Sequence, residues 1–358
     1  MSTGGVGPLQ GVRVLQLGGI GPVPFAATLL ADAGATLVCV DRPGATQDPG
    51  DPLARGRQTV LIDLKTESGR EEVLALAAAS DILLEGFRPG VLERMRLAPA
   101  SLLAANPRLV IGRMTGWGQH GPLAGSAGHD INFLALSGAL ACIGTQDSGP
   151  VPPLNLVADF GGGAMFLLFG VLAALHHART SGEGQVVDTA MSDGCVTLMG
   201  IFQWMRARGR WNSPRGGNWL DGGAPWYGCY RCSDDRWIAV GAVEPTFQKA
   251  FLLGLDLASE AQLEDMSDPA QWPNQKRLIA QRMATRPRDE WCDHFASLDA
   301  CVSPVLELAE VASHPHHAAR GTVVERFGVQ QPAPAPRFSM GDRADEIKIR
   351  TFDPEQRP

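Results

Sequence analysis

The sequence predicts an α/β protein with a Rossmann-like, doubly wound large domain and a smaller α+β domain. Up to residue 114, short and nearly continuous apolar segments alternate with helical segments, which is the pattern of a parallel sheet covered on both faces. Glycine- and proline-containing turns separate these segments. Beyond residue 207 the composition shifts to Gly, Asn, Trp and Pro, and a hairpin pattern with further helices follows.

The expected elements follow in order along the chain. Buried strands are predicted at 11–17, 36–40, 59–64, 81–85, 109–114 and 185–188, with helices at 25–33, 69–79, 165–175 and 191–206. A hairpin is predicted from 227–232 and 237–240, followed by helices at 247–253, 275–283 and 289–296 and a strand at 301–305. The predicted domains are a large domain at 1–207, a linker at 208–223, a small domain at 224–317, and a C-terminal segment at 318–358 that returns to the large domain.

Composition excludes several classes of function. The 358-residue chain carries a net charge of −7, so no nucleic-acid partner and no anionic membrane surface are expected. Its longest uncharged apolar run, 160–175, is shorter than the ~20 apolar residues that a membrane span needs and predicts a buried helix. The first eight residues lack the apolar region of a cleavable signal.

Cysteine usage favours a reducing cytoplasm. The seven cysteines are scattered and odd in number, which argues against a disulfide framework. Cys229 and Cys232 form a lone CxxC without a second ligand pair, so we expect a structural role and no metal site.

Two stretches place a titratable side chain where a loop meets a regular element. The first is Gly128–Phe133, which contains His129 and Asp130, and the second is Asn155–Gly163, which contains Asp159 before three glycines. We expect His129 and Asp159 to face each other across a substrate carbon. The simpler alternatives are a hydrogen-bonded structural histidine, a local-turn carboxylate at Asp130, and an N-cap role for Asp159.

The turn Gly18-Gly19-Ile20-Gly21 with the later Asp41 imitates a dinucleotide fingerprint. A third glycine is missing at the required spacing, and Pro22 and Pro24 stand where the helix should open. The alternative is a tight turn whose backbone closely approaches another group.

Further motifs connect these stretches to a known family. They are Arg113–Gln119 with Gly121-Pro122, Gly128–Asn132, Asn155–Gly163, Asp41-Arg42-Pro43, Asp63-Leu64-Lys65, Glu85–Gly90, Gly184–Asp188 and Gly241–Pro245. In this order they resemble the class III CoA-transferase (CaiB/BaiF) family, and within it the branch of racemases that act on 2-methylacyl-CoA thioesters. The resemblance covers most of the chain, although the last ~35 residues add little to it.

The resemblance implies an interlocked homodimer that binds an acyl-CoA thioester and needs no cofactor beyond the CoA of its substrate. It implies His129 and Asp159 as two acid/base groups and Glu244 as a carboxylate that orients the histidine. Its implied CoA- and substrate-binding residues are Arg42, Asp63, Leu64, Lys65, Gly86, Phe87, Arg88, Arg94, Gly128, Asp130, Ile131, Asn132 and Phe133. The backbone N–H of Asp130 is a candidate oxyanion donor.

Three alternatives remain open at this point. In a CoA-transferase of the same family, Asp159 would be a nucleophile that forms an acyl anhydride. Such an enzyme does not need His129, and the glycine-rich loop of transferases is reduced here to Gly222-Gly223. A non-catalytic acyl-CoA-binding protein would not need both His129 and Asp159, and an NAD-dependent oxidoreductase would need the glycine fingerprint that is broken here.

Overall fold

The computed structural model describes residues 7–211 and 213–339. The chain divides into two compact units: Met1–Ser137, Leu154–Met199 and Ala312–Pro358 form the first, and Gly138–Pro153 and Gly200–Val311 form the second. The short segment Gly138–Pro153 is thus grouped with the second unit although it lies within the first predicted domain. The predicted domain limits themselves stay a prediction.

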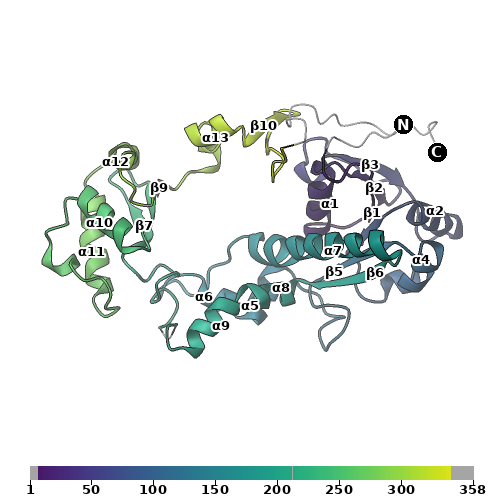
Figure 1. Cartoon of the computed structure of the whole chain (residues 1–358), viewed down its shortest axis with the longest axis horizontal. Helices are drawn as coiled ribbons and strands as arrows, with labels where there is room; N and C mark the ends of the chain where they lie inside the picture. Colours follow the sequence, from purple (N-terminus) through teal and green to yellow (C-terminus); the bar gives the residue numbers. More distant parts are fainter. Residues whose placement is uncertain (1–6, 212, 340–358) are drawn as a thin grey trace. The chain divides into compact units, whose positions relative to one another are not determined.

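A six-stranded parallel sheet forms the centre of the first unit (Figure 1). Its strands are β1 (Arg13–Leu17), β2 (Thr36–Asp41), β3 (Arg57–Leu61), β4 (Ile82–Glu85), β5 (Val110–Thr115) and β6 (Gln185–Ala190). They are arranged in the order β3-β2-β1-β4-β5-β6, and every neighbouring pair is parallel. This is the order of a dinucleotide-fold sheet, whose strand order reverses between β1 and β4. The predicted parallel α/β sheet is confirmed.

Helices cover both faces of this sheet. One face packs aliphatic side chains of β1, β2, β4 and β5 against α2 (Glu67–Ala78) and α4 (Pro99–Ala105), with Val73 and Leu102 fully buried. The opposite face carries α1 (Pro22–Asp32) and α7 (Met165–Ser181), which packs on β5 and β6. Gly112 of β5 leaves room for the side chains of Leu167 and Val171. The first unit also contains the short helices α3 (Val91–Arg94), α5 (Asp130–Ser137) and η1 (Pro52–Ala54).

Helix α1 begins three residues earlier than predicted. Pro22 and Pro24 occupy its first turn, where a missing backbone N–H costs no hydrogen bond and the fixed φ suits a helix. The two prolines, which argue against a dinucleotide-binding turn, therefore begin the helix. The two-proline opening follows Gly21, whose φ of 65° lies in the left-handed region.

The apolar segment before β6 is longer than predicted. The π-helical segment η2 (Leu156–Ala164) runs directly into α7, so Leu156–Ser181 is a helical stretch of 26 residues. By length and composition alone this stretch is sufficient to cross a membrane, with 39% of its most apolar window buried. The length argument drawn from residues 160–175 was therefore wrong. Because α7 packs on β5 and β6, part of its apolar surface is used within the protein itself.

The predicted helix 191–206 is two helices. Helix α8 (Met191–Leu198) ends at Leu198, and α9 (Gly200–Ala207) belongs to the second unit. Helix α8 packs closely on η2, since a Cβ on Gly194 would collide with the carbonyl group of Gly162. Only glycine at these two positions allows the backbones to approach this closely.

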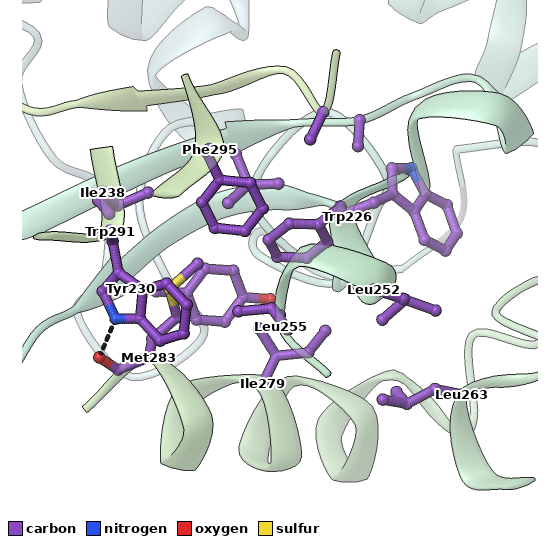
Figure 2. Packing of buried hydrophobic residues seen from close by; sticks show 14 of the residues in the cluster. Trp226, Tyr230, Ile238, Leu252, Leu255, Leu263, Ile279, Met283, Trp291 and Phe295 are labelled. Atoms are coloured by element: carbon purple, nitrogen blue, oxygen red, sulfur yellow. Dashed lines mark hydrogen bonds between the residues drawn. The ribbon is translucent and has the colours of Figure 1, made fainter. Parts of the chain in front are cut away.

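The second unit has a three-stranded antiparallel sheet in the order β7-β8-β9. Its elements are β7 (Tyr227–Arg231), β8 (Trp237–Gly241), β9 (Val302–Pro304), α6 (Ala139–Cys142), α10 (Pro245–Gly254), α11 (Trp272–Met283), α12 (Arg288–Phe295), η3 (Ala261–Leu263) and η4 (Leu308–Glu310). Figure 2 shows its core, where the Trp291 indole N–H donates to the carbonyl of Met283. Cys229 and Cys232 are free thiols, and no metal-binding group of His, Cys, Asp and Glu occurs in the described part of the chain.

The loop before β7 has internal order. Asp221 accepts hydrogen bonds from the backbone N–H groups of Gly216, Asn218 and Gly223 and from the Asn218 amide, at 2.8–3.2 Å. The ammonium group of Lys276 donates to the carbonyl of Gly222. Part of the predicted linker is therefore a hydrogen-bonded loop rather than an extended chain.

After helix α13 (Pro315–Arg320), a hairpin of β10 (Val323–Arg326) and β11 (Val329–Pro332) lies on the first unit. The Gln331 amide donates to the carbonyl of Gly50 at 2.7 Å, and Arg55 donates to the carbonyl of Pro332 at 2.9 Å. Arg55 also forms a buried ion pair with Asp32 of α1. These contacts attach residues that follow 318 to the sheet-containing unit.

Candidate active site

The carboxyl ends of β2, β3 and β4 place three exposed cations at one edge of the parallel sheet. Arg42 follows β2, Lys65 follows β3, and Arg88 follows β4. Asp63 accepts the backbone N–H of Lys65 at 3.0 Å and so shapes the turn that also carries Leu64. In open α/β sheets, ligands bind beyond the carboxyl ends of the strands. The structure thus brings these predicted CoA-binding positions to the same edge.

The loop after β4 is held by a buried ion-pair network that sequence reasoning did not find. The Glu85 carboxylate, fully buried, accepts the Phe87 backbone N–H at 2.7 Å and the Arg113 guanidinium at 2.6 Å. Arg113 also donates to Glu93 at 2.8 Å. Burial raises the pKa of Glu85, while its hydrogen bonds to Arg113 and Phe87 oppose that rise. Gly86 and Arg88 are the chain neighbours of Phe87, whose backbone this network holds.

Arg94 ends helix α3 and is exposed. A Cβ built on Gly90 would lie 3.1 Å from an Arg94 guanidinium nitrogen, so that side chain folds back over the loop after β4. Gly90 leaves room for it. Arg94 and Arg88 therefore belong to the same surface of the first unit.

His129 immediately precedes helix α5 and is exposed. Its backbone N–H donates to the Asn132 side-chain oxygen at 3.0 Å, and its carbonyl accepts the Asn132 N–H at 2.8 Å. Phe133 anchors the start of the helix through an edge contact with Trp117, with ring centroids 4.8 Å apart. A Cβ on Gly128 would lie 2.8 Å from the Phe133 ring. Ile131 stays exposed beside His129.

Asp159 lies within the π-helical segment η2. The residue at the N-cap position is Asn155, so the N-cap role considered for Asp159 is wrong. The Asn155 amide donates to Asp159 Oδ2 at 3.3 Å. A Cβ on Gly21 would lie 3.4 Å from the same oxygen, so the glycine turn after β1 approaches this carboxylate. The close approach expected of that turn from the sequence is thus to Asp159.

The electrostatic surroundings of Asp159 shift its titration. Burial raises the pKa of Asp159, the Asn155 hydrogen bond lowers it, the Asp130 charge raises it and the His129 charge lowers it. The net direction is upward. His129 and Asp130 belong to the first stretch singled out in the sequence, so the charges of that stretch act on the carboxylate of the second.

The Asp130 carboxylate forms the physical link between these stretches. Its Oδ2 atom accepts the backbone N–H groups of Ala158 and Asp159, both at 2.8 Å. The start of α5 is therefore bonded to the segment that carries Asp159. The result is an imidazole and a carboxylate at the N-terminal ends of two adjacent helical segments, an arrangement suited to moving protons on a bound substrate.

Glu244 is in the second unit. It is exposed, occupies the N-cap position of α10, and its backbone carbonyl accepts the Gln248 N–H at 3.0 Å. Its predicted role beside His129 stays a prediction. Sequence reasoning missed Asn155 and the pair Glu85–Arg113; a usable signal for Asn155 was its position four residues before Asp159, one helical turn away.

A family model described as CoA-transferase family III matches residues 9–355. The chain belongs to CoA-transferase family III. This member is similar to a mouse protein named alpha-methylacyl-CoA racemase, 44% identical over 92% of this chain and 85% of the relative, and to a human protein of the same name, 43% identical over 92% and 86%.

The fold of this family member also matches solved structures. A CaiB/BaiF family protein from Brucella suis superposes with a TM-score of 0.81 at 25% sequence identity, covering 97% of this chain and 96% of the other. The similarity therefore extends over both compact units of the family member, beyond the sheet that forms the centre of the first.

Proposed function

We propose that this protein interconverts (2R)- and (2S)-2-methylacyl-CoA thioesters by two-base 1,1-proton transfer through an enolate. A thioester makes the α-proton acidic enough to remove, and the planar enolate can then be protonated on either face. Racemisation needs one acid/base group on each face. The substrate supplies the CoA, and no further cofactor is proposed.

The observation that supports the proposal is the link between the segments that carry His129 and Asp159, made by the Asp130 carboxylate, which accepts the N–H groups of Ala158 and Asp159. His129 and Asp159 are titratable side chains of the first unit that lie in the family motifs, and the charge of His129 acts on Asp159. The close relatives that carry the name alpha-methylacyl-CoA racemase support the same reaction. Glu244 is proposed to orient His129.

The enolate oxygen needs a donor. We propose the backbone N–H of Asp130, the first residue of α5, because the leading N–H groups of a helix have no carbonyl partner within it. The partial positive charge of a helix N-terminus also favours an oxyanion there. Gly128, Ile131, Asn132 and Phe133 would shape the surface on which the thioester lies.

A CoA-transferase is the second candidate, because the family is named for that activity and Asp159 could act as a nucleophile. The hydrogen-bonded loop around Asp221 is one observation against it, since a loop fixed by several hydrogen bonds and Lys276 is poorly suited to close over an acyl intermediate. The need for His129 distinguishes the two reactions.

The deciding experiment measures α-proton exchange. We expect the wild-type protein to incorporate deuterium from D₂O at C2 of separated 2R and 2S 2-methylacyl-CoA esters, with no added CoA acceptor, and to invert their configuration. An intact α-proton together with transfer of CoA to a free acid would reject the racemase and support the transferase.

We further propose that Arg42, Lys65, Arg88 and Arg94 contact CoA phosphates. Arg88→Ala should then raise KM for acyl-CoA and weaken its dependence on salt, while kcat changes much less, because a phosphate contact is made equally in ground and transition states. Arg179→Ala is the matched control: it is an exposed arginine near the C-terminal end of α7, outside the proposed phosphate contacts. An unchanged KM in Arg88→Ala, or a loss confined to kcat, would remove this residue from the CoA site.

The assembly is proposed to be an interlocked homodimer in the cytoplasm. Helix α7 and its π-helical extension expose large apolar side chains, with Phe169 77% exposed and Met165 50% exposed, which a second chain could cover. Sedimentation at low concentration should detect no folded monomer. A stable and active monomer would contradict the proposal.

A further inference from the structure

The Asp130 carboxylate is buried, and its two oxygens differ in their hydrogen bonds. It is 7% exposed, and its Oδ2 atom accepts two backbone hydrogen bonds from Ala158 and Asp159. Its Oδ1 atom is also buried, and among the residues that the structure describes it has no hydrogen-bond partner. A buried carboxylate with an unpartnered oxygen carries a desolvation cost that a neutral side chain would avoid.

We propose that Asp130 is a positioning residue for proton transfer, which fixes the backbone of Asp159 opposite His129 and acts on Asp159 through its negative charge. This inference rests on the proposed racemase function. It differs from the oxyanion role suggested for the Asp130 backbone, because it concerns the side chain. The sequence places Asp130 beside His129 but gives no indication that its carboxylate reaches residues 158 and 159.

The positioning follows from where the two bonds are made. Ala158 and Asp159 are consecutive residues of η2, and their N–H groups converge on one oxygen, which fixes the orientation of that peptide segment. The acceptor is itself the first residue of α5, directly after His129. A displacement of the η2 backbone relative to the start of α5 must break these bonds. Misplacement of a catalytic group by about 1 Å can cost on the order of 10²-fold in rate.

The charge has a separate consequence. The negative charge of Asp130 raises the pKa of Asp159, in the same direction as burial and against the effects of Asn155 and His129. A raised pKa brings a carboxyl group closer to the operating pH, where it can both accept and return a proton. Asparagine at position 130 could accept both backbone bonds through its amide oxygen but would supply no charge. A purely structural anchor would therefore work equally well as asparagine.

Other charged groups near Asp159 do not replace this effect. His129 faces it from the start of α5, and on α8 the nearby Cys195 has a pKa raised to about 11 by burial, Asp130 and Asp159, so its thiol stays neutral. The remaining ionisable groups on the elements packed against η2 are Asp32, His176, His177 and Arg179 near the C-terminal ends of α1 and α7, Asp193 in the first turn of α8, where it is exposed to solvent, and Asp188 on β6, which accepts the Gln119 N–H. None of them is among the charges that shift the pKa of Asp159.

The test uses two substitutions at one position. Asp130→Ala removes the acceptor, and we expect α-proton exchange to fall on the order of 10²-fold, with acyl-CoA binding retained. Asp130→Asn should restore most of the rate but move the acidic limb of the pH profile to lower pH, because Asp159 loses the charge that raises its pKa. The profile is measured on the enantiomer whose exchange survives His129→Ala, since Asp159 is its remaining base.

Asp51→Asn is the matched control, because Asp51 likewise accepts a backbone N–H, from Leu53 at 2.9 Å, but lies outside the site. It should leave rate and profile unchanged. A readout independent of turnover is the carboxyl ¹³C titration of Asp159, assigned by its loss in Asp159→Asn, which should shift to lower pH in Asp130→Asn.

Two outcomes would overturn the inference: full activity of Asp130→Ala, or an Asp159 titration that is the same in Asp130→Asn and wild type. If Asp130→Ala does not fold, the asparagine variant still decides, since it preserves both backbone bonds. If wild-type protein exchanges no α-proton, the proposed function fails, while the carboxyl titration still tests the influence of Asp130 on Asp159.

Discussion

His129→Ala should abolish racemisation while leaving deuterium exchange on one enantiomer. Each base lies on one face of the enolate, so Asp159 alone can still remove a proton from its own enantiomer and return a deuteron to the same face. Configuration is then retained although the proton is replaced. The loss of inversion should be on the general acid–base scale, roughly 10²–10⁴-fold, and acyl-CoA binding should survive.

Separated enantiomers and a second variant make this result specific. Asp159→Ala should show the same behaviour with the opposite enantiomer, so the two variants together assign one base to each face. His177→Ala, an exposed histidine near the C-terminal end of α7, is the control and should behave as wild type. Acyl transfer that is lost in Asp159→Ala but unaffected in His129→Ala would instead identify a nucleophilic aspartate and a transferase.

The parallel sheet could be predicted because its signal is local. Strands such as β1 and β4 are buried along most of their length, and most of their residues are apolar. Helix boundaries depend on weaker signals. The sequence prediction starts the first helix at residue 25, after Pro22 and Pro24, whereas the first turn of a helix accepts both prolines. The break at Met199 was missed because apolar residues continue into α9 at helical spacing.

The same difference between local and long-range signals applies to the candidate site. His129 and Asp159 could be singled out because they occur in short motifs at junctions between loops and helices. The contacts that set their geometry join residues 28 and 29 positions apart, from Asp130 to Ala158 and Asp159. Such contacts depend on how η2, α5 and α8 pack together, and that packing is set by close glycine contacts that no periodicity reveals. Backbone hydrogen bonds to a distant side chain are a property of the folded chain.

The buried network that holds the loop after β4 gives the largest expected effect on stability. In Arg113→Met, the Glu85 carboxylate stays buried and loses its cation, and Glu93 loses the same partner. Breaking a buried pair by removing one member typically costs about 3–5 kcal/mol. We expect the free energy of unfolding to fall by that amount at neutral pH, as measured by urea denaturation. KM for acyl-CoA should rise as well, because Glu85 holds the Phe87 backbone and the loop after β4.

The effect of Arg113→Met should depend on pH with a definite sign. Burial already raises the pKa of Glu85, and removing Arg113, which lowers it, raises it further. A group whose pKa is raised by folding favours the folded state at low pH and loses that contribution as pH rises through its folded pKa. The variant should therefore approach wild-type stability on acidification, as Glu85 takes up a proton.

The double variant Glu85→Gln/Arg113→Met removes both charges and should recover much of the lost stability at neutral pH, since a neutral pair leaves no buried charge uncompensated. A single variant that is equally destabilised at every pH, with no recovery in the double variant, would show that Arg113 acts through packing rather than through the charge of Glu85.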